Sequence, residues 1–101
     1  MTKTTTATDR LPVRVQRLLD LATKYGLAVE PMEDQAGRCY RSRAWAVRLG
    51  ERWYDSRVLI HWMRFNDAKG PGRVSLTWIS GSGERMRKIP LKSAAIWMKP
   101  L

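Results

Sequence analysis

The sequence predicts an α+β domain: an N-terminal amphipathic helix packed on a three- to four-stranded antiparallel meander, followed by a short C-terminal helix. Residues 57–65 and 73–80 are apolar runs rich in β-branched and aromatic side chains, as strands are. Residues 66–72, rich in Gly, Pro, Asn and Asp, join them, and a third run follows the Gly-rich turn at 81–83. Residues 11–25 instead carry apolar side chains at helical spacing.

The length of 101 residues suits one small domain, which we expect over residues 10–101. Residues 1–9 are rich in Thr and lack the apolar middle of a signal peptide, so we expect a disordered tail. A single cysteine, Cys39, excludes an internal disulfide and indicates a reducing compartment. No apolar run reaches the roughly 18 residues of a membrane span. We therefore expect a cytoplasmic protein with no membrane partner.

The N-terminal helix is expected from Leu11 to Tyr25. Five apolar residues recur on one of its faces: Leu11, Val15, Leu18, Ala22 and Tyr25. Asp9 can cap its start, Pro12 suits its first turn, and Gly26 can end it in a left-handed conformation. We expect this helix to cover one face of the sheet.

Residues 38–56 fit either a strand or a helix. Trp45, Val47 and Leu49 alternate with smaller or charged residues, which favours a strand. The alanines between them tolerate a helix, but Gly50 and the density of aromatic residues argue against one. We predict a strand that ends in a turn at Gly50.

The next run, residues 57–65, is apolar on both faces, which predicts a central strand covered on both sides. One face carries Val58, Ile60 and Trp62, and the other carries Leu59, His61, Met63 and Phe65. The N-terminal helix can cover one face, so the other needs the C-terminal segment or a second copy of the chain. Residues 73–80 point Val74, Leu76 and Trp78 inward, and residues 84–89 are expected to pair with them.

The remaining elements are short. Residues 27–30 suit a strand closed by Pro31. Residues 93–98 begin with a capping Ser and contain good helix formers. A helix this short needs tertiary packing, which we expect from Ile96 and Trp97 against the sheet.

The charge is strongly positive and unevenly distributed. Nineteen Lys and Arg residues stand against nine acids, a net charge of +10. Residues 1–37 are neutral, and residues 38–101 hold 14 bases against four acids. Such an excess favours polyanionic partners: nucleic acid first, an acidic protein second and an anionic membrane third. Arg outnumbers Lys 13 to six, which suits bidentate phosphate contacts but equally fits codon bias in a GC-rich genome.

The sequence offers no constellation for catalysis. His61 lies in the most apolar strand and is interpreted as a packed or hydrogen-bonded structural residue, and nothing local supports its pairing with Cys39 as base and nucleophile. The acids of the basic half are isolated, so we expect neither a zinc site nor a two-metal nuclease site. The Gly-rich segment 69–73 joins two strands rather than opening a helix, unlike phosphate-binding loops. We predict a non-enzymatic protein without catalytic residues, metal or cofactor.

What remains is a basic surface interleaved with aromatic residues, in which aromatic planes stack bases and cations neutralise phosphates. The candidate nucleic-acid contacts are Arg41, Arg43, Arg48, Arg52, Trp53, Tyr54, Arg57, Lys69, Arg73, Arg85, Arg87 and Lys88. Trp53 or Tyr54 would stack, and the loop at 66–73 would reach into a groove. Trp62, Trp78 and Trp97 are assigned to the core.

In composition the chain resembles the small orphan proteins of bacteriophages that infect actinobacteria: a Thr-rich start at residues 2–6, Arg over Lys, one Cys and basic Trp-bearing strands. The resemblance implies a non-enzymatic protein that acts on nucleic acid or on a host protein. We predict a small basic nucleic-acid-binding module, with DNA preferred over RNA as partner. The alternative is a protein-interaction module or inhibitor of an acidic host protein, or a homodimer formed through Leu59, Met63 and Phe65.

Overall fold

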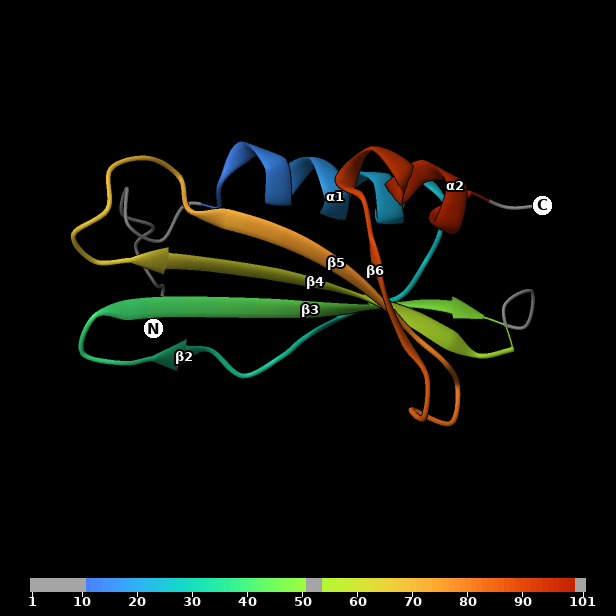
Figure 1. Ribbon diagram of the computed structural model, residues 1–101. Coiled ribbons are helices and arrows are strands. Elements are labelled where there is room, and N and C mark those ends of the chain that lie inside the picture. The colour runs from blue at the N-terminus through green and yellow to red at the C-terminus, as the bar shows by residue number, and fades with distance from the viewer. Residues whose placement is uncertain (1–10, 51–53, 100–101) are drawn as a thin grey trace, which may run out of the picture.

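The computed structural model describes residues 11–50 and 54–99, which form a six-stranded antiparallel sheet with two α-helices (Figure 1). The elements in chain order are α1 (Val13–Lys24), β1 (Val29–Pro31), β2 (Gln35–Ala36), β3 (Tyr40–Gly50), β4 (Ser56–Phe65), β5 (Arg73–Ile79), β6 (Met86–Ile89), a 3₁₀ turn (Leu91–Ser93) and α2 (Ala94–Met98). The predicted α+β class with an antiparallel sheet is confirmed. The expected tail at residues 1–9 lies outside the described residues.

The sheet is ordered β1-β3-β4-β5-β6, and β2 also pairs with β3. The predicted count of three to four strands is too low because β1 and β2 lie in succession along one edge of β3. Val29 is opposite Val47 in the first pair, and Gln35 is opposite Ser42 in the second. Strand β1 overlaps the strand expected at residues 27–30, but it begins at Val29 and includes Pro31, which was expected to close it. The two-residue β2 has almost no sequence signature, since it depends on the edge of β3 for its hydrogen bonds.

Helix α1 forms where the apolar spacing places it and ends as predicted. Gly26 has φ +70°, and the amide of Leu27 donates to the Ala22 carbonyl at 3.0 Å, a Schellman motif. At the other end the Pro12 carbonyl accepts the first helical hydrogen bond, from the amide of Gln16 at 3.0 Å. The proposed cap, Asp9, lies outside the described residues. Neither described helix is long and apolar enough to cross a membrane.

The core lies between α1, α2 and one face of the sheet. The ambiguous region is a strand, β3, and its alternation buries Trp45, Val47 and Leu49. The inward residues predicted for β4 and β5 are also confirmed, since Val58, Ile60, Trp62 and Leu76 are buried and Val74 and Trp78 pack against them. The period of two along each strand therefore assigned the core side correctly.

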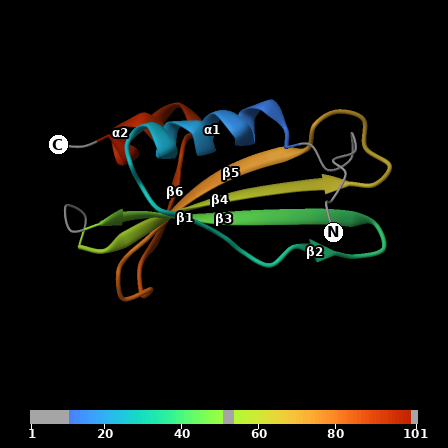
Figure 2. The same cartoon turned by 180° about the vertical axis from the view of Figure 1, so that it is seen from behind.

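Both helices cover the same face of the sheet (Figure 1), and Figure 2 shows the same arrangement from behind. The expectation that β4 would be covered on both sides is therefore wrong. The 3₁₀ turn after β6 returns the chain to the side of α1, where Trp97 packs against Trp78 with ring centroids 5.8 Å apart.

Ile96 is also placed differently from the prediction, being 73% exposed. In a helix of five residues only one stripe can face the sheet, and Ala94 and Met98, four residues apart, occupy it. Ile96 falls midway between them along the chain and therefore points away from the sheet.

Candidate nucleic-acid interface

The side of the sheet turned away from both helices is called the open face here. It is defined by alternate strand residues: Tyr40, Ser42, Ala44, Ala46 and Arg48 of β3; Arg57, Leu59, His61, Met63 and Phe65 of β4; Arg73, Ser75, Thr77 and Ile79 of β5; Met86 and Lys88 of β6; with Glu30 of β1 and Gln35 of β2 at the edge. No helix of the described chain covers it (Figure 1).

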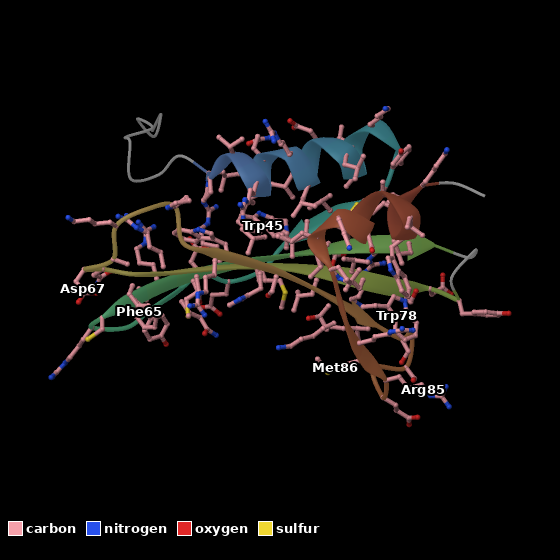
Figure 3. The ribbon with its side chains drawn as sticks, turned by 45° about the horizontal axis from the view of Figure 1, so that its top comes forward. Trp45, Phe65, Asp67, Trp78, Arg85 and Met86 are labelled. Carbon is pink, nitrogen blue, oxygen red and sulfur yellow. The ribbon has the colours of Figure 1, made fainter. Side chains whose placement is uncertain are left out.

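The antiparallel register arranges the open face in rows across the sheet. At one end Tyr40 is opposite Phe65, and at the other end Arg48 is opposite Arg57. These rows are eight residues apart along β3, which corresponds to roughly 27 Å of strand. Figure 3 shows Phe65 near one end of the molecule and Met86, whose row includes Arg57, well away from it on β6.

The charged residues of the open face are mostly cations. Arg48, Arg57, Arg73 and Lys88 point to it, and Glu30 is the one carboxylate on the described strands. Glu30 forms an ion pair with Arg48 at 2.9 Å. In the described part of the chain the other three cations form no ion pair. The open face therefore has a net charge of about +3 with little internal compensation.

The predicted contact residues fall into three groups. Those on the open face are Arg48, Arg57, Arg73 and Lys88. Those on the helix-covered face of their strands are Arg41, Arg43 and Arg87. Those in turns and loops are Tyr54, Lys69 and Arg85. Arg52 and Trp53 lie outside the described residues.

The alternation of side chains along a strand explains why the predicted contact residues lie on both faces of the sheet. Arg43 and Arg48 are separated by an odd number of residues, so their side chains point to opposite faces. On the covered side the Arg43 guanidinium lies 5.1 Å from the Trp45 ring centroid and 3.2 Å from an oxygen of Asp34. Arg43 is thus engaged with its own fold. Tyr54, proposed as a stacking residue, is 88% exposed in a turn between β3 and β4.

The structure adds Tyr40, His61, Met63 and Phe65 to the candidate surface. Tyr40 was not predicted to take part, and the others were assigned to an apolar or structural role. The alternation along β4 could have placed these β4 residues on one surface: Trp62 faces the core, so His61 and Met63 on either side of it must face the other way. What the alternation does not tell is that this side has no cover.

The loop between β4 and β5 is folded back on the sheet. The indole nitrogen of Trp62 donates to the Pro71 carbonyl at 2.6 Å, and the Arg64 guanidinium donates to the Ala68 carbonyl at 3.1 Å. At its start the Asn66 amide side chain donates to the Arg38 carbonyl at 2.9 Å. These bonds leave a hollow of about 300 Å³ against the ends of β4 and β5. Trp62 and Arg64 point to the helix-covered side of β4, so these bonds hold the loop on that side, where it borders the end of the open face at Phe65.

Among the described residues, no three or more His, Cys, Asp or Glu side chains are grouped to hold a metal ion. Comparisons with protein-family models, with curated proteins and with solved structures found no match to this chain. The inference of function therefore rests on the geometry and charge of the open face.

Proposed function

We propose that this protein is a non-enzymatic nucleic-acid-binding module that uses the open face. The observation behind the proposal is that both helices lie on one side of the sheet and leave a surface with four cations and one carboxylate on the other. Cations at such spacing neutralise phosphates and release counterions, which drives binding to any polyanion. The aromatic and apolar side chains between them suit contacts with bases.

The charge and the side chains of the open face also argue against the two alternative partners, a second copy of the chain and an acidic protein. A symmetric face-to-face dimer would bring Arg57, Arg73 and Lys88 of one copy close to the same cations of the other, which is unfavourable. The apolar residues of the open face are interrupted as well, since Leu59 is opposite Thr77 and not opposite another apolar side chain. An acidic protein would satisfy the charge, but it would not use the exposed aromatic residue at the end of β4 as a base would.

The test is the salt dependence of binding to a fluorescently labelled single-stranded oligonucleotide of mixed sequence, measured by anisotropy. With four phosphate contacts, from the unpaired Arg57, Arg73 and Lys88 of the open face and from Lys69 of the adjoining loop, log affinity should fall by about 2.8 per unit of log salt, or about 50-fold between 50 and 200 mM. The double variant Arg57→Gln/Lys88→Gln should lower this slope to about 1.4, because it removes two contacts from the open face.

The matched control is Arg14→Gln/Arg17→Gln, which removes the same charge from exposed positions of α1 on the other side of the molecule. The control should keep the slope of the unmodified protein. Binding that is independent of salt would refute the proposal. So would a control that loses as much affinity and slope as the open-face variant, since the interaction would then follow net charge and not this surface.

A further inference from the structure

We infer that the ligand is a single strand and that the hollow beside Phe65 holds one of its unpaired bases. The inference rests on the proposed function and names its class of ligand. The hollow lies where β4 and β5 join their connecting loop, at one end of the open face. Its walls combine apolar surface with three cations: Met63, Phe65, Ala68, Pro71 and Gly72, with Arg64, Lys69 and Arg73. Arg64 is the one of the three that already donates to the loop, at the Ala68 carbonyl.

The hollow is held in shape by contacts between the loop and β4. The Trp62 indole anchors the loop at the Pro71 carbonyl, 2.6 Å away. Gly72 lies so close to β4 that an added Cβ would be 2.5 Å from the Met63 carbonyl oxygen and 2.7 Å from the indole nitrogen. Only glycine permits this approach. A preformed wall costs less conformational entropy on binding than a loop that must be ordered by the ligand.

The chemistry of the hollow matches a nucleotide with a free base. Phe65 is 49% exposed and presents a ring for stacking, and Met63 adds a polarisable apolar contact. Lys69 and Arg73 are exposed, and neither forms an ion pair with another described residue, so both are available for the flanking phosphates. Asp67, the carboxylate of the loop, is exposed and does not line the hollow, and it lies at the same end of the molecule as Phe65 (Figure 3).

A duplex would make poor use of this site. Paired bases are stacked on both sides within the helix and present only their edges in the grooves. The ring of Phe65 could then meet only sugar and phosphate, and the apolar wall would be left without a partner. In a single strand the base can turn out and stack, as in other sheet-based and groove-based binders of unpaired strands.

The open face continues from this hollow to Arg57, eight residues along β4 and roughly 27 Å away. A strand that runs from the hollow to that cation would occupy about four to eight nucleotides, within the usual range for single-strand binders. Oligonucleotides of increasing length should therefore gain affinity steeply up to about eight nucleotides and only slowly beyond that.

The test compares three labelled probes by anisotropy: a 12-nucleotide deoxythymidine strand, the equivalent uridine strand and a 12-base-pair DNA duplex. Phe65→Ala should weaken binding of the single strands roughly 5- to 150-fold, the range for loss of one base–aromatic stack, and leave duplex binding unchanged. Phe65→Tyr keeps the ring and should retain single-strand affinity. Ile96→Ala, which truncates an apolar residue exposed on α2, should change nothing.

A second variant tests the hollow without changing a residue of a β-strand. Lys69→Gln lies in the loop and should reduce the salt slope for single strands by about 0.7. Binding of either single strand, deoxythymidine or uridine, satisfies the inference. The ratio of the two affinities tells whether DNA or RNA is preferred.

The inference is overturned if Phe65→Ala weakens single strands and duplex by the same factor, or weakens neither. In that case salt-dependent binding by the unmodified protein would still support the proposed function. If the unmodified protein binds none of the three probes, both proposals fail.

Discussion

Two glycines of the loop between β4 and β5 provide a sharp test of how this site is built. Gly70 and Gly72 both have positive φ, +100° and +91°. A Cβ at Gly70 would meet nothing within 4 Å, whereas a Cβ at Gly72 would collide with the Met63 carbonyl and the Trp62 indole nitrogen. Substitution of each by Ala therefore imposes a similar backbone strain, and only one of the two also displaces the loop from the sheet.

The expected magnitudes follow from these contacts. An Ala at positive φ costs about 1–2 kcal/mol, partly offset by about 0.4–1 kcal/mol from the reduced entropy of the unfolded chain, so Gly70→Ala should destabilise the fold by about 1 kcal/mol. Gly72→Ala should also break the bond from Trp62 to Pro71 and leave a part-buried donor without its partner, which adds about 1–3 kcal/mol. Its total cost should be about 3 kcal/mol.

Thermal unfolding followed by circular dichroism measures both costs. In a domain of this size 1 kcal/mol shifts Tm by about 4–8 °C, so Gly72→Ala should unfold at least about 8 °C below Gly70→Ala. Gly72→Ala should also weaken single-strand binding at temperatures where it is folded, because it displaces a wall of the hollow. Equal Tm values for the two variants would refute the close approach of the loop to β4 on which the hollow depends.

Two further predictions concern the open face and the core. Glu30→Gln removes the partner of Arg48 and should change the free energy of unfolding by no more than about 1 kcal/mol, because the pair is exposed. The same variant should increase nucleic-acid affinity and steepen the salt slope by about 0.7, since it frees Arg48 for an additional phosphate contact; an unchanged slope in anisotropy titrations would contradict this. Leu76→Ala should destabilise the fold by about 2–5 kcal/mol in urea unfolding, because Leu76 is 1% exposed at the centre of the core. A cost no greater than that of truncating the exposed Ile96 would show that β5 does not pack as described.

Much of the architecture could be predicted because its causes are local in the chain. The helical spacing of apolar residues and the left-handed Gly26 define α1 and its end. The alternation along β3, β4 and β5 predicts which side chains face the core, since successive strand residues must point to opposite sides. The two short strands β1 and β2 could not be predicted as a pair along one edge, because they exist only where β3 offers that edge.

The candidate site depends on relations that the chain does not encode locally. Alternation separates Arg43 from Arg48 and assigns one face to the core, but it does not tell whether the opposite face is covered as well. That is decided by the turn after β6, which places α2 beside α1 and leaves the opposite side open. The hollow likewise needs the bond between Trp62 and Pro71, two residues in different elements.

By itself, then, the sequence determined the fold class, the inward faces of the strands and the excess of positive charge, because each follows from residue type and spacing. Tertiary structure alone decided which charges share a surface, and so which of them can contact one ligand together. The physical reason is that a sheet face is assembled from residues on different strands, so its composition depends on register and on the placement of the helices.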